Sequence, residues 1–169
     1  MKKTSSILMF FLVAYSILPI ALSGQGQDPV TGGEARLESW KIHLQMKANS
    51  SFKDLKWRAV GPEQQGGRIE TIACHPDEPY TIYVGAGSGG LWKTNNHGTT
   101  WTPIFDDQPT FAMGSLAIAP SDPKVLWLGT GEVLMARSSY SGLGIFKSVD
   151  AGKSWQHMGL EDSYHIPKV

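Results

Sequence analysis

Short runs of apolar and β-branched residues, separated by turn residues, recur along the chain from about residue 66 onward. Each run has the length of a strand and ends at a cluster of Gly, Pro, Asn or Asp, which is typical of strands joined by tight turns. The pattern predicts strands at residues 68–75, 81–85, 90–94 and 101–105, and again at residues 112–119, 125–129, 144–148 and 155–158.

The two sets of strands are copies of one unit. Residues 90–101 match residues 144–155 by residue class at nearly every position, 54 residues further along the chain. Residues 76–87 match residues 120–131 at a separation of 44, so the second copy gains ten residues within 132–143. Several short strands that repeat at this period are typical of β-propeller blades.

The repeat predicts an all-β fold, a partial β-propeller of four-stranded antiparallel blades. We expect blade 1 at about 66–106, blade 2 at about 112–158 and the start of a third blade at about 165–169, which echoes residues 65–69. Propellers close with about four to eight blades. The sequence therefore reads as the N-terminal piece of a longer protein, with an incomplete propeller over 55–169 whose partners include its missing blades.

The N-terminus predicts export. Lys2 and Lys3 precede an apolar run over residues 7–22, and small residues follow it. This order predicts a signal peptide over residues 1–23. The run is shorter than the roughly 20 residues of a membrane span, and Pro19 interrupts it. We therefore expect a secreted protein (periplasmic, cell-surface or extracellular) without a membrane anchor after cleavage.

Residues 24–54 form a leader that differs in character from the repeats. Its first part is polar and rich in glycine, whereas the part from Glu34 onward places Leu37, Trp40 and Leu44 at i, i+3 and i+7 with charges between them. This spacing predicts a short amphipathic helix, which we expect to dock on its own domain.

Composition excludes several classes of function. The chain has 15 basic and 15 acidic residues, and loss of the two N-terminal lysines leaves 13 against 15, so no electrostatic binding of nucleic acid is expected. Cys74 is the only cysteine; it forms no intrachain disulfide, and we expect it to be a small buried hydrophobe. The five histidines lack metal-ligand spacing, so neither a metal nor a cofactor is expected.

The segment from Val84 to Gly90 spells G-x-G-x-x-G, the pattern of a dinucleotide-binding loop. Such a loop requires a helix after its last glycine, whose N-terminus meets the pyrophosphate. Residues 91–101 instead predict a strand, a turn and a strand. The glycines are therefore assigned to the hairpin between the second and third strands of blade 1.

Two segments, 94–101 and 148–155, share the form [ST]-x-[DN]-x-G-x-[TS]-W. The hydroxyl and the carboxylate or amide can bind backbone N–H groups of the turn, the glycine supplies a positive φ, and the tryptophan can pack on a neighbouring sheet. The pattern resembles the Asp-box (BNR) repeat, and we expect a structural rather than a catalytic role. The residues concerned are Thr94, Asn96, Gly98 and Trp101 in blade 1, and Ser148, Asp150, Gly152 and Trp155 in blade 2.

With the flanking motifs at 57–62, 66–69 and 129–132, the chain resembles secreted Asp-box propellers of the sortilin-type and xyloglucanase-like group. Members of that group include peptide-binding receptors, photosystem assembly factors and glycosidases. The resemblance implies a binding module for a protein, peptide or glycan as the leading hypothesis. The alternative is part of a xyloglucanase-like or sialidase-like glycoside hydrolase whose catalytic residues lie in missing blades.

Two departures from the enzyme patterns favour the binding module. In xyloglucanase-like enzymes a catalytic aspartate precedes Gly-Gly in the blade-one hairpin, and Gly87 stands at that position here. The Arg-Ile-Pro motif of sialidases is replaced by Arg68-Ile69-Glu70. Hydrolysis needs a pair of carboxylates, and Glu132 with its loop is the only candidate in view, so no catalytic residue is assigned.

The inserted loop of blade 2 marks the expected ligand face. The hairpin between the second and third strands of a blade lies opposite the hairpin between the third and fourth, so residues 132–143 emerge away from the Asp-box turns. Arg and Tyr are favoured anchors at binding surfaces. The candidate residues of this ligand face are Arg68, Glu132, Arg137 and Tyr140.

Overall fold

The structure is a computed structural model that describes residues 31–56, 67–133 and 139–169. The predicted signal peptide at 1–23 and the flanking motif at 57–62 lie outside the described residues. Within the described ranges, no helix combines the length and the apolar character that crossing a bilayer requires.

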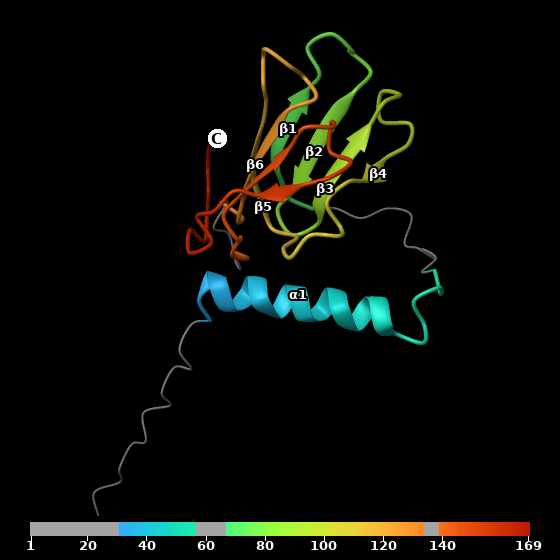
Figure 1. Ribbon diagram of the computed structural model, residues 1–169. Coiled ribbons are helices and arrows are strands. Elements are labelled where there is room, and N and C mark those ends of the chain that lie inside the picture. Colours follow the sequence, from blue (N-terminus) through green and yellow to red (C-terminus); the bar gives the residue numbers. More distant parts are fainter. Residues whose placement is uncertain (1–30, 57–66, 134–138) are drawn as a thin grey trace, which may run out of the picture. The chain divides into compact units, whose positions relative to one another are not determined.

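Two antiparallel sheets of the same topology form the described β-structure (Figure 1). In each sheet every strand pairs with the next one along the chain, which is the arrangement of a propeller blade. The all-β prediction of two four-stranded blades in a partial β-propeller is therefore confirmed. Blade 1 comprises β1 (Ile69–Cys74), β2 (Ile82–Ala86), β3 (Gly90–Thr94) and β4 (Thr102–Pro103), and blade 2 comprises β5 (Met113–Ile118), β6 (Leu126–Thr130), β7 (Ile145–Ser148) and β8 (Gln156–His157).

The first strand of each blade carries an irregularity at the same place. The pairing register shifts between Ile69 and Thr71 in blade 1, and between Met113 and Ser115 in blade 2. Such bulges bend a strand and increase its twist. Since the two shifts occupy equivalent positions, the blades share local geometry as well as strand order.

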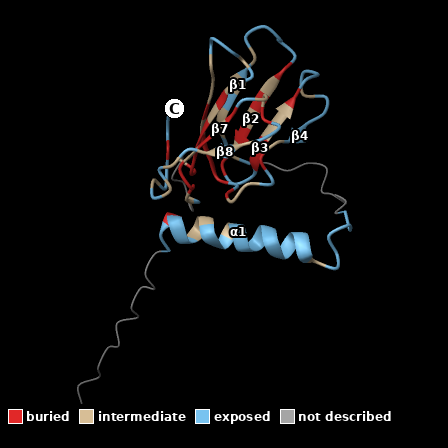
Figure 2. Ribbon diagram, viewed as in Figure 1, coloured by how far each residue is buried: buried red, intermediate tan, exposed pale blue. Residues whose placement is uncertain are grey.

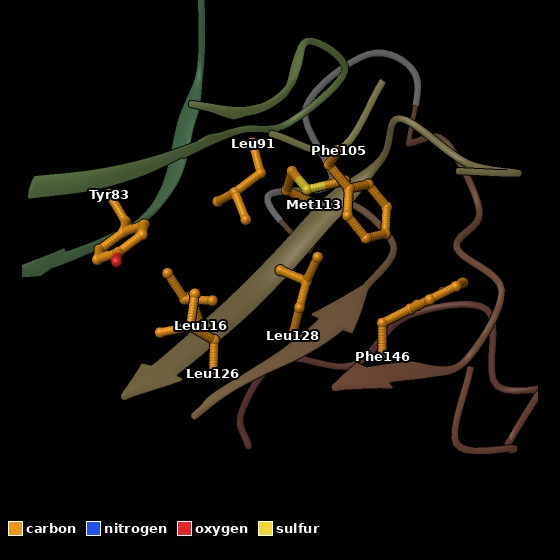
Figure 3. Packing of buried hydrophobic residues seen from close by; sticks show 8 residues of the cluster. All are labelled: Tyr83, Leu91, Phe105, Met113, Leu116, Leu126, Leu128 and Phe146. Carbon is orange, nitrogen blue, oxygen red and sulfur yellow. The ribbon is translucent and has the colours of Figure 1, made fainter. Parts of the chain in front are cut away.

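The hydrophobic core lies between the two blades (Figure 3). Successive strand residues point to opposite faces, so one face of blade 1 and one face of blade 2 supply the apolar side chains. The rings of Phe105 and Phe146 meet edge to face, with centroids 5.1 Å apart. The buried cluster consists of Tyr83, Leu91, Phe105, Met113, Leu116, Leu126, Leu128 and Phe146.

The segment that follows blade 2 is hydrogen-bonded back to blade 2, and the linker that follows blade 1 is likewise hydrogen-bonded back to blade 1. The amide of Gly90 donates to the carbonyl of Phe111 at 3.0 Å, and the amide of Gly142 donates to that of Tyr164 at 2.7 Å. Ile166 is buried against Gly129, where an added Cβ would lie 2.5 Å from its Cγ2 atom. Residues 165–169, the predicted start of a third blade, contain no assigned strand.

Helix α1 (Gly33–Asn49) is present where the leader predicts a helix, and it belongs to the same compact unit as the blades. Its links are polar: the Arg36 guanidinium donates to the carbonyl of Gly142 at 2.8 Å, and the amide of Gly33 donates to the Asp162 carboxylate at 2.7 Å. Leu44, part of the predicted docking stripe, is 42% exposed, and most of the helix is exposed in Figure 2.

The prediction that Cys74 is a buried hydrophobe is wrong, because its side chain is exposed at the end of β1. Cys74 and Ile72 are two residues apart on one strand and therefore share a face. This face points away from the core, and Ile72 is 64% exposed on it. The thiol is exposed because the described residues place no second sheet on that side of blade 1.

Replacement of Gly114 by Ala tests the close approach of the C-terminal segment to blade 2. The added Cβ would lie 2.4 Å from the carbonyl oxygen of Ile166 and 2.9 Å from that of Gly131, so backbone has to move. We expect the Gly114→Ala variant to lose about 1–3 kcal/mol of unfolding free energy in urea titrations.

Gly67→Ala is the matched control, because a Cβ at Gly67 meets no described atom within 4 Å. Its unfolding free energy should stay close to that of the wild type. Equal losses in the two variants would contradict the proposed close approach.

Candidate functional site

The turn between β7 and β8 is held together by its own side chains. Ser148 Oγ donates to Asp150 Oδ1 at 2.8 Å and accepts the amide of Gly152 at 2.9 Å. Asp150 also accepts the amide and the hydroxyl of Ser154, at 2.9 and 2.5 Å. These hydrogen bonds, first of all that from the Ser154 hydroxyl, lower the pKa of Asp150 from its ordinary 3.8 to about 2.

The turn between β3 and β4 repeats this arrangement with an amide in place of the carboxylate. Thr94 Oγ1 donates to Asn96 Oδ1 and accepts the amide of Gly98, both at 2.9 Å. Asn96 Oδ1 accepts the amide of Thr100 at 2.9 Å. The polar side chains of the two capped turns, 94–101 and 148–155, thus bind the backbone of their own turns.

The two tryptophans of the capped turns have different surroundings. The Trp155 indole donates to the carbonyl of Ile104 in blade 1 at 2.7 Å, and its ring lies edge-on to Phe105 with centroids 5.2 Å apart. Trp101, its counterpart in blade 1, is 40% exposed. Trp155 therefore links blade 2 to blade 1 through a hydrogen bond and a ring contact. No described sheet lies beside Trp101.

An ion pair joins the blades at the opposite end. Arg68, just before β1, donates from Nε to Glu132, just after β6, and the Glu132 side chain is fully buried. The amide of Tyr140 donates to the second carboxylate oxygen at 3.2 Å. The hydrogen bond from Arg68 holds the pKa of Glu132 below its ordinary value, although burial acts in the opposite direction. The same bond raises the pKa of Arg68.

Gly87 lies directly beneath this carboxylate. A Cβ added at Gly87 would come within 2.9 Å of Glu132 Oε1. An aspartate at position 87 would therefore place a second carboxylate against Glu132. Sequence reasoning noted Gly87 and Glu132 separately but missed this contact, because 45 positions separate them in the chain.

Two exposed aromatic rings lie on the same end of the blades. Phe111 in the linker between the blades is 55% exposed, and Tyr140 in the inserted loop is 46% exposed. Their ring centroids are 5.6 Å apart and the planes are inclined by 53°. The sequence analysis did not predict Phe111 as a residue of the ligand face. The only signal for it in the sequence is its position in the linker between the fourth strand of blade 1 and the first strand of blade 2.

The structure thus brings together Arg68, Glu132 and Tyr140 of the predicted ligand face, and adds Phe111 to them. The fourth predicted residue, Arg137, lies outside the described residues. Aromatic rings beside fixed polar groups suit a ligand that offers both C–H surfaces and hydroxyl groups. Glu132 is unsuited to act as a general acid near neutral pH, because its lowered pKa keeps it ionised.

No family model matches the chain. Among curated proteins, the xyloglucanase Xgh74A of Acetivibrio thermocellus is 29% identical over 103 residues, which cover 52% of this chain and 11% of the relative. A xyloglucanase from a Paenibacillus species is 26% identical over 117 residues, which cover 66% of this chain and 11% of the relative. The chain thus spans about a tenth of the length of these relatives.

Solved structures give similar matches at lower identity. The GH74 enzyme of Niastella koreensis matches with a TM-score of 0.45 and 21% identity, over 57% of this chain and 14% of that one. YCF48 of Cyanidioschyzon merolae matches with a TM-score of 0.41 and 15% identity, over 59% of this chain and 29% of that one.

The two tryptophans allow a matched test of how the blades are held together. Trp155 is half-buried against Ile104 and Phe105, so Trp155→Ala should lower the unfolding free energy by about 2–3 kcal/mol, below the loss for a fully buried ring. Trp101→Ala should cost about 0.5 kcal/mol or less. Similar losses in urea titrations of the two variants would contradict the fastening role of Trp155.

The lowered pKa of Asp150 predicts a pH dependence of stability. The folded-state pKa of about 2 lies below the ordinary 3.8, so the ionised group stabilises the fold above the higher value. This stabilisation is lost as the pH falls from 3.8 towards 2. We expect Asp150→Asn to remove that part of the pH dependence of the unfolding free energy.

The reciprocal change, Asn96→Asp, is the matched control, since Thr94 and Thr100 surround position 96 as Ser148 and Ser154 surround Asp150. It should add a similar acid dependence. Parallel curves of unfolding free energy against pH for the wild type and Asp150→Asn would refute this role of the carboxylate.

Proposed function

We propose that the two blades are part of a xyloglucanase-like glycoside hydrolase and that they contact its polysaccharide through the face formed by Arg68, Phe111, Glu132 and Tyr140. The observation that carries the proposal is the sequence similarity to xyloglucanases. The alignments cover 52% and 66% of this chain, far beyond the eight-residue capped turns.

The geometry of the face supports contact with a sugar. The rings of Phe111 and Tyr140 are exposed and inclined to each other, and each can stack on the C–H surface of a pyranose ring. The pair of Arg68 and Glu132 anchors the backbone of Tyr140 through its amide. In this proposal the ion pair is a positioning element, and the aromatic rings are the contact groups.

The catalytic carboxylates are proposed to lie outside these two blades. Gly87 provides no carboxylate, and Glu132 is fully buried in an ion pair. The comparisons support this hydrolase alternative better than the binding module that led the sequence interpretation. Export through residues 1–23 and assignment of the capped turns as Asp-box turns are further parts of the proposal.

Affinity electrophoresis of the full chain in gels containing xyloglucan tests the contact face. We expect xyloglucan to retard the wild type, and Phe111→Ala or Tyr140→Ala to weaken binding about 2- to 10-fold, since an aromatic contact contributes about 0.5–1.5 kcal/mol. Phe52→Ala is the control, because it also removes an exposed aromatic ring. Phe52 is 72% exposed and lies outside the blades. Unchanged retardation of both variants would refute the face.

The branched substrate distinguishes a xyloglucanase-like site from a general glycan-binding surface. A site shaped for xyloglucan has to accommodate xylosyl branches on a β-1,4-glucan backbone. The full chain should therefore bind a xyloglucan oligosaccharide more tightly than an unbranched cello-oligosaccharide of the same backbone length, as measured by calorimetry. Equal binding, or no binding of either sugar, would contradict the proposal.

A further inference from the structure

A pocket lies between helix α1 and the linker that follows blade 1. Its volume is about 440 Å³, within the roughly 300–1,000 Å³ that is typical of small-molecule sites. Trp40 of the helix and Phe111 of the linker provide aromatic rings on its wall, whereas Asp106, Gln108 and Thr110 provide polar side chains. A wall that combines apolar rings with a few hydrogen-bonding groups is the usual composition of a ligand site. We call it the helix pocket.

Polar links tie α1 to the rest of the chain on both sides of Trp40. Nearer the start of the helix, the Arg36 guanidinium donates to a carbonyl of the inserted loop at 2.8 Å. Nearer its end, Lys47 Nζ lies 3.1 Å from Asp107 Oδ1 in the linker. The indole of Trp40 is stacked on the His43 ring, with centroids 4.9 Å apart and planes inclined by 18°. These contacts place the indole at the wall of the helix pocket.

The polar side chains of the helix pocket retain unused hydrogen-bonding capacity. Thr110 is buried, and its hydroxyl oxygen accepts the amide of Ala112 at 3.3 Å. Within the part of the chain that the structure describes, the Asp106 carboxylate, the Gln108 amide and the Trp40 indole N–H form no hydrogen bond with protein. A carboxylate accepts hydrogen bonds, an amide both donates and accepts them, and an indole N–H donates. Together these groups suit a ligand that carries several hydroxyl groups.

The helix pocket is continuous with the proposed contact face. Phe111 lines the pocket and also lies beside Tyr140, with ring centroids 5.6 Å apart. Its side chain is 55% exposed, so the ring is accessible to a ligand. Tyr140, Phe111 and Trp40 thus lead from the inserted loop across the linker to the helix. A glycan that contacts the first two rings and extends by further sugar residues reaches the third.

We propose that the helix pocket is a subsite for one neutral pyranose residue of the polysaccharide. The inference rests on the proposed function, whose contact face it extends from Phe111 to α1. Trp40 and Phe111 offer ring surfaces to the C–H groups of the sugar, and Asp106 and Gln108 bind its hydroxyl groups. Because Asp106 is the single charged residue among the described residues that line the pocket, a sugar that carries a carboxylate is disfavoured.

Calorimetric titration of the full chain with a xyloglucan oligosaccharide of two repeating units tests the subsite. Trp40→Ala should weaken binding about 2- to 10-fold, since an aromatic contact contributes about 0.5–1.5 kcal/mol, and Trp40→Phe should restore most of the loss. Asp106→Ala should weaken binding by a similar factor. Asp106 is exposed, so this second variant keeps the test valid if Trp40→Ala loosens the helix. Met46→Ala is the control, because Met46 is 68% exposed on α1 and does not line the pocket.

The outcomes separate failure of the subsite from failure of the proposed function. Binding of Trp40→Ala and Asp106→Ala at wild-type affinity, while Tyr140→Ala binds more weakly, would overturn the subsite alone. Absence of binding by the wild type would overturn both the subsite and the proposed function. An equal loss of affinity in Met46→Ala would also overturn the subsite, because the effect would then belong to the helix as a whole.

The charge of Asp106 gives a second, specific readout. The same oligosaccharide, after oxidation of its primary hydroxyl groups to carboxylates, should bind the wild type more weakly than the neutral sugar does. Asp106→Asn retains the shape of the side chain but removes its charge, so it should narrow this difference. A difference that is unchanged in Asp106→Asn would overturn the assignment of Asp106 to the subsite.

Discussion

The packing of one four-stranded sheet face to face on the next is the constraint on which the described structure depends. An isolated sheet of this size leaves apolar side chains exposed on its two faces, and burial of that surface is the main source of stability. Here Leu128 and Phe146 of blade 2 are buried against Tyr83 and Leu91 of blade 1. The capped turns add to this contact, because Trp155 in one of them reaches the backbone of blade 1.

The same packing builds the candidate site. When blade 2 packs on blade 1, Glu132 after β6 meets Arg68 before β1 and packs over Gly87. The linker that joins the blades carries Phe111 to the same end, next to Tyr140. The proposed contact surface therefore lies where the two blades meet, and residues of both blades and of their linker are needed to form it. The ion pair at this contact has one buried partner, Glu132, and one partly exposed partner, Arg68. Such a pair is weak support for a gain in stability.

The sequence predicts the features that repeat locally along the chain, but not the contacts between residues that are distant in the sequence. Matching strands, capped turns and a loop insertion can be read from spacing because backbone propensity and side-chain alternation act over a few residues. The contact of Gly87 with Glu132 and that of the inclined rings of Phe111 and Tyr140 depend on how the blades pack, which no local pattern encodes. Cys74 was misassigned for a related reason: alternation predicts which face of a strand a residue occupies, but not whether another sheet covers that face.

In the proposed function, the end of the blades opposite the capped turns is the surface that contacts polysaccharide. Hydrogen exchange of backbone amides, measured with and without a xyloglucan oligosaccharide, tests it most directly. We expect slower exchange around residues 109–112 and 139–143, where Phe111 and Tyr140 lie, with no change in the capped turns at 94–101 and 148–155. Protection confined to the capped turns, or no protection at saturating sugar, would contradict it.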